Sequence, residues 1–373
     1  MEYKYQKNNM LSAKLQAWFQ QNCRDLPWRN TRNPYLIWVS EIILQQTRVA
    51  QGLDYYNRFV ERFPDVLSLA ESDETEVLKY WQGLGYYSRA RNMHVAARQI
   101  KMQHAGAFPQ QYAQVLALKG VGDYTAAAIC SFAYNQPYAV LDGNVFRVLA
   151  RLFGIETPIN APRAKREFSE LAQNLLDNTH SAVHNQAIME FGALQCTPQS
   201  PDCGICPLQE ICNAFCNKKV NMLPVKLKKA TAKARFFNYF FVKNSDFTYL
   251  KKRESNDIWK NLYEFPLIET ATASDINDLL VSENFREIFA DSGKIDIAGL
   301  PFVQKHVLTH RIIHAVFYII NIEGEPCGDF AKILQRDLHE YPVSRLVELF
   351  LERLFFHPLP PPAGDSLTAA GYL

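Results

Sequence analysis

The sequence predicts a multi-domain chain, with an all-α domain followed by a smaller α+β domain. Up to residue 216, apolar side chains recur at helical spacing and turn signals separate the segments. From residue 236 onward, aromatic and β-branched runs are typical of strands. Four closely spaced cysteines end the first region and predict a metal centre. We therefore expect a helical domain at 1–216, a basic linker at 217–235, an α+β domain at 236–352 and a disordered tail at 353–373.

The helices of the first region are predicted from apolar positions that repeat every three or four residues. In the first helix, Leu11, Leu15 and Phe19 lie on one face. Short glycine turns at 83–85 and 120–122 interrupt the pattern. The predicted helices are 11–19, 34–46, 75–81 and 142–153.

The second region is predicted to combine a sheet with a few helices. Its aromatic and β-branched runs indicate strands at 236–242, 247–252 and 311–322. Apolar periodicity indicates helices at 274–280 and 343–351, and Ser274 is the expected N-cap of the former.

Bulk composition leaves the function open. Forty Lys and Arg against 38 Asp and Glu give a net charge of +2, so overall charge does not indicate a nucleic-acid-binding protein. The stretch 218–235 holds seven Lys or Arg and no acid, so it is either a solvated linker or a surface that follows phosphates. A polar N-terminus and the lack of an apolar run of about 18 residues predict neither signal peptide nor membrane span. We expect a soluble intracellular protein, cytoplasmic and nucleoid-associated if the source is a bacterium.

The cysteine cluster has ligand-like spacing. Four thiolates within seventeen residues can surround one centre, and prolines in the same stretch oppose helix formation. In a reducing compartment this density argues for a metal instead of disulfides. Spacing alone leaves two candidates, a tetrahedral zinc site and a [4Fe–4S] cluster. The cysteines are Cys196, Cys203, Cys206 and Cys212.

A glycine turn and an aspartate about twenty residues later form a second constellation. Gly120 and Gly122 allow close approach of the backbone to a partner, and the helix start that follows suits a DNA phosphate. Asp142 precedes an apolar helix, so it is either the helix N-cap or a catalytic carboxylate. The turn together with 140–148 resembles the helix-hairpin-helix motif of DNA glycosylases, with Asp142 at the position of the catalytic aspartate.

Three further motifs resemble those of the MutY-type adenine DNA glycosylases. They are Leu26-Pro27-Trp28-Arg29, the stretch 38–47 (WVSEIILQQT) and the stretch 83–91 (GLGYYSRAR). With the hairpin and the cysteine spacing, the resemblance covers most of residues 15–225. It implies a helix-hairpin-helix glycosylase domain that carries a [4Fe–4S] cluster on the four cysteines.

The resemblance also implies a mechanism. Adenine is a poor leaving group because its departing electrons need a proton. Glu41 matches the general acid that protonates N7, and Asp142 matches the carboxylate that stabilises, or bonds to, the cationic sugar carbon. Tyr124 and Asn144 are implied as helpers around Asp142 and the attacking water. Tyr124 also stands where strand-cutting relatives have a lysine, which predicts a monofunctional enzyme; Lys119 is the nearby candidate for a weak lyase side reaction.

Base removal from a duplex requires the base to be flipped out, and the resemblance implies which residues do this. Arg29 and Gln186 would line the adenine pocket, whereas Glu190 is expected to be structural. Gln46 and Tyr86 would wedge into the duplex beside the oxidised guanine. The expected phosphate contacts are Gly120, Gly122, Arg89 and Arg91.

Residues 236–352 resemble the Nudix-like domain with which such glycosylases recognise 8-oxoguanine. The stretch 257–266 matches a family loop, with Asn261 where a glycine is usual. The stretch 306–310 (HVLTH) resembles the recognition loop but departs from the usual Phe-Ser-His, and Thr309 and His310 are the expected lesion contacts. The glutamate-rich hydrolase signature is absent, so we expect recognition without pyrophosphatase activity.

The predicted function is removal of adenine mispaired with 8-oxoguanine or guanine in double-stranded DNA by a monomeric enzyme. One alternative is an endonuclease III-like glycosylase-lyase that acts on oxidised pyrimidines, which Tyr124 and the C-terminal domain oppose. The other is a catalytically silent DNA-binding protein, which the presence of both Glu41 and Asp142 opposes. A sliding clamp and a mismatch-repair protein are the candidate protein partners.

Overall fold

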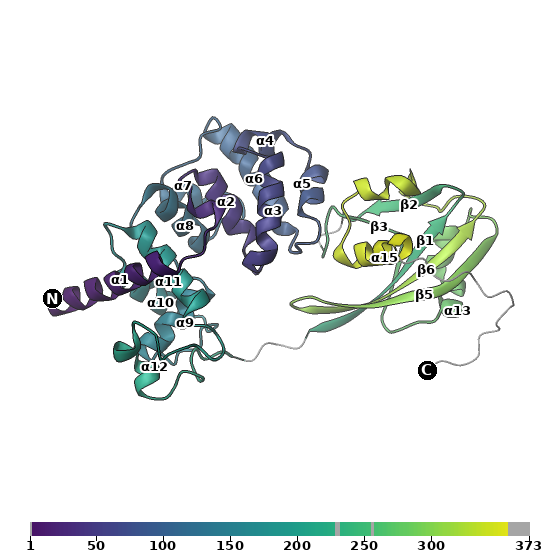
Figure 1. Ribbon diagram of the computed structural model, residues 1–373. Coiled ribbons are helices and arrows are strands. Elements are labelled where there is room, and N and C mark those ends of the chain that lie inside the picture. Colours follow the sequence, from purple (N-terminus) through teal and green to yellow (C-terminus); the bar gives the residue numbers. More distant parts are fainter. Residues whose placement is uncertain (1, 228–231, 255–256, 357–373) are drawn as a thin grey trace. The chain divides into compact units, whose positions relative to one another are not determined.

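The computed structural model describes residues 2–227, 232–254 and 257–356 (Figure 1). The chain forms two compact units, and each is made of two stretches of sequence. Met1–Ser72 and Arg89–Lys229 form the first, helical unit. Asp73–Ser88 and Ala230–Leu373 form the second, which holds the sheets. The expected disorder of residues 357–373 concerns a stretch outside the described residues.

The described residues of the first unit form helices and loops and contain no strand, as predicted. A buried cluster of apolar side chains, with Leu15, Leu149 and Phe168 fully enclosed, joins its helices. The elements are α1 (Glu2–Asn22), η1 (Pro27–Arg29), α2 (Pro34–Ile43), α3 (Val49–Arg62), α4 (Val66–Glu71), α6 (Ser88–Gln103), α7 (Tyr112–Leu116), α8 (Asp123–Tyr134), α9 (Gly143–Phe153), α10 (Ala164–Leu175), α11 (Ser181–Leu194), η2 (Gln209–Ile211) and α12 (Asn213–Cys216).

Helices α9 and α11 approach each other closely at one glycine. A Cβ atom on Gly192 of α11 would lie 2.7 Å from the Cβ atom and 2.9 Å from the carbonyl oxygen of Asn144, at the start of α9. Such distances are sterically forbidden, so only glycine permits this packing. The contact places the N-terminus of α9, with Asp142 and Asn144, against α11.

The second unit contains a four-stranded sheet and a three-stranded sheet. The order in the first is β4-β1-β6-β5, with β1 and β6 parallel and the outer pairs antiparallel. The order in the second is β3-β2-β7. The elements are α5 (Glu74–Trp81), β1 (Lys233–Lys243), β2 (Phe247–Lys252), β3 (Tyr263–Glu264), β4 (Leu267–Thr270), α13 (Ile276–Val281), α14 (Glu283–Phe289), β5 (Ile295–Val307), β6 (Arg311–Ile322), β7 (Ala331–Leu334), η3 (Gln335–Glu340) and α15 (Arg345–Phe356).

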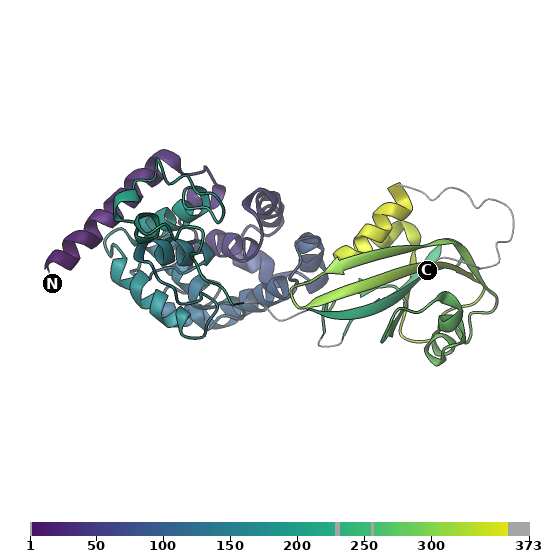
Figure 2. The same ribbon diagram turned by 90° about the horizontal axis from the view of Figure 1, so that it is seen from below.

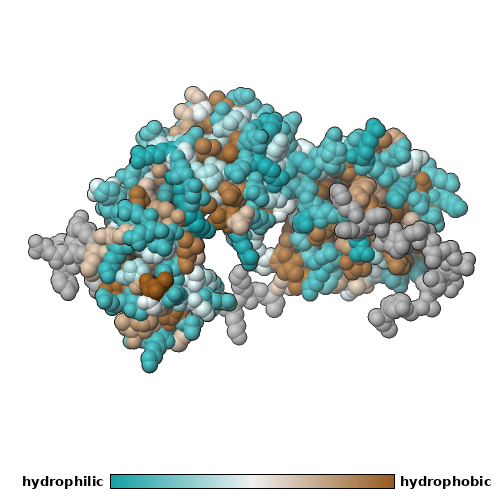
Figure 3. Space-filling model, viewed as in Figure 1, coloured by the Kyte–Doolittle hydropathy of each residue, from teal (hydrophilic) through white to brown (hydrophobic). Residues whose placement is uncertain are grey.

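Helices cover both faces of the four-stranded sheet. On one face Phe237, Phe317 and Phe350 pack together, which joins the sheet to α15. On the other face Phe240 packs against Phe285 and Phe289 of α14. Figure 2 shows α15 on one side of the strands and the shorter helices on the other. The surface in Figure 3 is mostly hydrophilic, with brown patches on this unit. Strand β5 exposes apolar side chains such as Leu300 and Val303.

Several predicted boundaries differ from the structure. Strand β1 starts at Lys233, inside the expected linker, and α15 runs to Phe356, past the expected start of the tail at 353. The N-cap of α13 is Asp275, not Ser274, because its carboxylate accepts hydrogen bonds from two backbone N–H groups of the first turn. Helix α2 ends at Ile43, three residues earlier than predicted.

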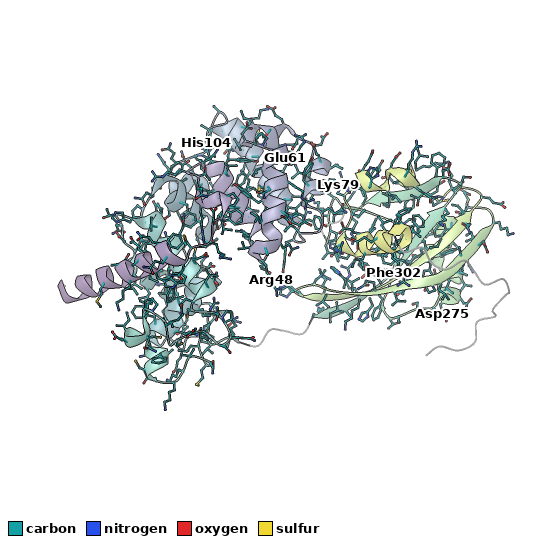
Figure 4. All side chains as sticks on the ribbon, viewed as in Figure 1. Arg48, Glu61, Lys79, His104, Asp275 and Phe302 are labelled. Atoms are coloured by element: carbon teal, nitrogen blue, oxygen red, sulfur yellow. The ribbon has the colours of Figure 1, made fainter. Side chains whose placement is uncertain are left out.

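The stretch Asp73–Ser88 belongs to the sheet-containing unit, although the helical unit flanks it in sequence. Lys79 of α5, labelled in Figure 4, donates a hydrogen bond to the carbonyl oxygen of Tyr341. Gln82 bonds to Glu348 of α15 and to the backbone N–H of Val343. These contacts fix the turn that follows α5, which carries Tyr86.

Candidate active site

Glu41 lies on the buried face of α2 and is 7% exposed. Tyr124, in the first turn of α8, donates a 2.6 Å hydrogen bond to its Oε2 atom. Burial raises the pKa of Glu41 to about 7, and the charge of Asp142 adds to the increase, while the Tyr124 bond and Arg29 oppose it. Glu41 is therefore a carboxyl group that can hold a proton near neutral pH, which a general acid requires.

Asp142 is the N-cap of α9, so the helix-cap interpretation of the sequence is confirmed. Its Oδ1 atom accepts hydrogen bonds from the backbone N–H groups of Asn144 and Val145, at 3.0 and 2.8 Å. Its Oδ2 atom accepts a 2.7 Å bond from the Asn144 side chain. Burial raises the pKa of Asp142, and these three bonds counteract that increase because they favour the carboxylate. Capping and catalysis are compatible, since the cap fixes the carboxylate in one orientation.

Hydrogen bonds link Asp142, through Asn144 and Arg147, to the backbone of α11. Arg147, one turn along α9, donates to the Oδ1 atom of Asn144 at 2.8 Å. The same guanidinium donates to the carbonyl oxygens of Gly192 and Cys196. The amide oxygen of Asn144 thus accepts from Arg147, and its amide nitrogen donates to Asp142, so the orientation of the amide group is fixed.

Glu41 and Asp142 line one cavity of about 880 Å³ in the helical unit. Its wall also contains Tyr124, Asn144 and Arg147. Arg48, labelled in Figure 4, lies at the start of α3 and lines the same cavity. Of the expected base-binding residues, the cavity wall includes Arg29, Gln186 and Gln46.

Glu190 forms a buried ion triplet in the wall of this cavity. Arg24 and Arg29 both donate to its carboxylate, with closest distances of 2.5 and 2.7 Å, and Glu190 is 1% exposed. Burial alone would raise the pKa of Glu190, but these hydrogen bonds and charges lower the pKa to about 2. Glu190 is thus a permanent anion that orients Arg29, in keeping with the expected structural role.

The two expected wedge residues share an unusual backbone conformation. Gln46 has φ of 56° and Tyr86 has φ of 47°, in the left-handed region that side-chain-bearing residues rarely adopt. Such strain concentrates at functional positions. Within the second unit, the Tyr86 hydroxyl lies 2.8 Å from the hydroxyl of Thr309, in the predicted recognition loop, and His310 is exposed beside it.

The expected phosphate contacts have mixed surroundings. Gly120 has φ of 79° and Gly122 is the N-cap of α8, so the glycine turn leads directly into a helix start as predicted. Arg89 donates through Nη1 to the carbonyl oxygens of Ile42, Ile43 and Gln45, which caps the C-terminus of α2. This gives Arg89 a structural role that the sequence did not indicate. Arg91 is half-buried on α6, and its phosphate contact stays a prediction.

The chain resembles known DNA repair proteins in both sequence and fold. The model of the HhH-GPD superfamily base excision DNA repair protein matches residues 39–174, and that of the NUDIX domain matches 238–353. The adenine DNA glycosylase of Buchnera aphidicola subsp. Baizongia pistaciae is 37% identical over 80% of this chain and 82% of its own length. The chain belongs to the MutY-type adenine DNA glycosylase family.

Other proteins that resemble this chain support its assignment to the family and its fold. The adenine DNA glycosylase of Mus musculus is 43% identical over 54% of this chain and 41% of its own length. A thermostable thymine-DNA glycosylase structure has a TM-score of 0.53 at 28% identity and covers 57% of this chain and 98% of its own. An endonuclease III–DNA complex, at 21% identity and a TM-score of 0.50, shares the fold. The predicted family and the predicted fold class are both confirmed.

The adenine glycosylase family member carries an iron–sulfur centre, since the iron–sulfur binding domain of endonuclease III matches residues 196–212. The residues fit this [4Fe–4S] cofactor, because all four thiols are half-buried, free of disulfides and line one cavity. No group of three His, Cys, Asp or Glu side chains that could hold a single metal ion occurs in the described part of the chain. The cluster is therefore assigned from the family match and the shared cavity. The ligands are Cys196, Cys203, Cys206 and Cys212.

The sequence did not indicate the roles of Arg147 and Arg24 in the site. Arg147 lies three residues after Asn144, so helical spacing could have placed it beside Asn144. Arg24 reaches Glu190 across 166 positions of sequence, and no local pattern indicates that contact.

Among the described residues no helix is long and apolar enough to cross a membrane.

Proposed function

We propose that this DNA glycosylase excises adenine mispaired with 8-oxoguanine, or with guanine, from double-stranded DNA. The main observation in support is that two carboxyl groups with different hydrogen-bonding surroundings line one cavity. Glu41 is buried with a pKa of about 7, while Asp142 is held by three N–H donors. N–H donors favour an ionised carboxylate, so the single proton that the pair retains near neutral pH belongs on Glu41.

In the proposed reaction Glu41 donates its proton to N7 of the flipped adenine. The proton neutralises the departing base and weakens its bond to C1′ of the sugar. Asp142 stabilises the positive charge that develops at C1′, or bonds to that carbon. Water then adds at C1′, displaces any bond to Asp142 and gives up a proton, which leaves an abasic site and a free carboxylate. Asn144 keeps the Asp142 carboxylate in place, and Tyr124 keeps the Glu41 carboxyl group oriented.

Arg29 and Gln186 are proposed to bind the adenine ring in the cavity. Both line its wall, and Arg29 is fixed by two hydrogen bonds to Glu190. An oriented guanidinium can donate to a purine ring nitrogen, while the Gln186 amide can both accept from and donate to the adenine edge. The flipped base leaves a gap in the duplex, which Gln46 and Tyr86 are proposed to fill.

The enzyme is proposed to be monofunctional, releasing the base without cutting the strand. A lyase needs an amine that attacks C1′ and forms a Schiff base. Among the described residues that line the cavity, none is a lysine. At the position where a lyase has its lysine, Tyr124 donates to Glu41, and burial raises the pKa of its phenol well above the ordinary value.

Recognition of the partner base is proposed for the second unit. Thr309 and His310 lie in the loop between β5 and β6, and Thr309 bonds to Tyr86. A wedge residue tied to the recognition loop would insert only where that loop accepts the base opposite adenine.

We further propose that the protein acts as a monomer and that a sliding clamp or mismatch-repair protein recruits it. The residues proposed to lie near DNA phosphates are Gly120, Gly122, Arg89 and Arg91.

A panel of duplexes tests the proposal. Each duplex carries one adenine opposite 8-oxoguanine, guanine, cytosine or thymine, and free adenine is measured under single-turnover conditions. The expected order of rates is 8-oxoguanine first, guanine second, and little release from the other two. A further duplex carries one oxidised pyrimidine, and release of that base, with no release of adenine from the panel, would favour the lyase alternative.

A further inference from the structure

We propose that Arg151 is a positioning residue of the iron–sulfur centre, which clamps the chain on both sides of the cluster loop and donates a hydrogen bond to the Cys196 thiolate. Arg151 lies at the C-terminal end of α9, two turns beyond Asn144, and is 2% exposed. It lines the same cavity as the four cysteines.

The guanidinium contacts two separate stretches of chain. Its Nη1 and Nη2 atoms donate to the carbonyl oxygens of Thr197 and Pro198, at 2.7 and 3.1 Å, directly after the first cysteine. Its Nε atom donates to the carbonyl oxygens of Val220 and Leu223, at 3.1 and 2.9 Å, beyond the last cysteine of the loop. One rigid, planar group therefore fixes both ends of the segment that surrounds the centre, which an ammonium group cannot do with the same geometry.

A fifth contact joins Arg151 to a cluster ligand. Its Nη1 atom lies 3.4 Å from the Sγ atom of Cys196, within the distance of an N–H···S hydrogen bond. A bound cluster holds its cysteines as thiolates and gathers negative charge in a partly buried place. Among the described residues that line this cavity, Arg151 carries positive charge and Asp202 carries negative charge. The arginine therefore compensates ligand charge from inside the fold.

Two consequences follow from this geometry. Loss of the clamp should loosen the loop, so the cluster should be lost faster. Loss of the positive charge and of the N–H···S bond should make the reduced cluster less favourable and move its reduction potential to a more negative value. The faster cluster loss comes from the missing guanidinium N–H donors, and the change in reduction potential comes from the missing charge. Two different substitutions can therefore separate the two effects.

The test uses Arg151→Gln and Arg151→Lys in the full chain, with Arg166→Gln as the matched control. Arg166 lies on α10 with an 87% exposed side chain, so its removal reports the general effect of losing one arginine. Iron per protein, the loss of cluster absorbance in a chelator, and the reduction potential are measured on each protein.

We expect Arg151→Gln to lose its cluster at least tenfold faster than the control and to show a more negative potential. Arg151→Lys should also lose the cluster faster, while its potential stays near that of the parent protein. If Arg151→Gln does not fold, Arg151→Lys alone tests whether Arg151 holds the cluster loop in place. A rate of cluster loss in Arg151→Lys within twofold of the control would overturn this role. An unchanged potential in a folded Arg151→Gln protein would overturn the charge role.

Discussion

The phenol of Tyr124 donates a 2.6 Å hydrogen bond to the Oε2 atom of Glu41. This bond lowers the pKa of Glu41, whereas burial raises it, and the balance lies at about 7. Tyr124 therefore sets how far toward alkaline pH Glu41 still holds a proton. The relation between these two residues yields three predictions about pH.

Base release by the parent protein should decline as pH rises through about 7. Glu41 acts as an acid only while protonated, so its active fraction falls about tenfold for each pH unit above its pKa. Single-turnover rates of adenine release between pH 5.5 and 9 check this. A rate that increases through pH 7 would rule out Glu41 as the proton donor.

Tyr124→Phe should move that decline to higher pH. Without the hydrogen bond the carboxylate form of Glu41 loses a stabilising contact, so the pKa of Glu41 rises further above its ordinary value. The same rate profile, recorded on the variant, provides the measurement. A decline at unchanged or lower pH would contradict the role given to the phenol.

Glu41→Gln should make the fold more stable at alkaline pH. The native pKa of Glu41, about 7, lies above the ordinary 4.5, so stability is full below 4.5 and is lost as pH rises to about 7. The variant lacks this loss and should gain on the order of 3 kcal/mol at pH 8 and little at pH 4.5.

Chemical denaturation at both pH values measures the difference. Glu61→Gln is the matched control, because Glu61 lies exposed on α3 (Figure 4). An equal gain at both pH values, or a gain in the control as well, would show that ionisation of Glu41 is not the cause.

Much of the architecture was predictable because local patterns and family motifs agree with it. Strands β2 and β6 begin and end where the sequence indicated, since their apolar runs end in turn residues. Asp142 was predicted both as cap and as catalytic group, and the cap is confirmed while catalysis stays a prediction. The four cysteines were assigned by resemblance, and the family match supports that assignment.

What could not be predicted depends on contacts between distant residues. The burial of Glu41 follows from the packing around α2, and the Arg24–Glu190 pair spans 166 positions. Asp73–Ser88 joins the sheet-containing unit through side chains such as Gln82 that carry no distinctive local signal. The phosphate contact of Arg89 stays a prediction, whereas its hydrogen bonds to the C-terminal end of α2 had no signal in the sequence.

Thr309→Val should reduce the preference for 8-oxoguanine over guanine opposite adenine. The substitution keeps the shape of the side chain and removes the hydroxyl that bonds to Tyr86, so a loss of about tenfold in the ratio of binding constants is expected. Tyr86→Phe removes the other half of this bond and should have a similar effect.

Competition binding with both duplexes measures the ratio. Thr272→Val is a matched control, because Thr272 is exposed between β4 and α13. A ratio unchanged in both Thr309→Val and Tyr86→Phe would remove the hydrogen bond from the recognition proposal.

The most direct test of the central claim is adenine release by Asp142→Asn from a duplex with adenine opposite 8-oxoguanine. Asparagine also caps helices, so the substitution removes the charge and keeps the fold. Asp275→Asn, at the cap of α13 (Figure 4), is the matched control.

We expect the parent protein and the control to release adenine, with strand breaks only after alkali. Asp142→Asn should bind the duplex normally and release adenine roughly a thousandfold more slowly or not at all. Release at the parent rate by Asp142→Asn would contradict the carboxylate-pair mechanism.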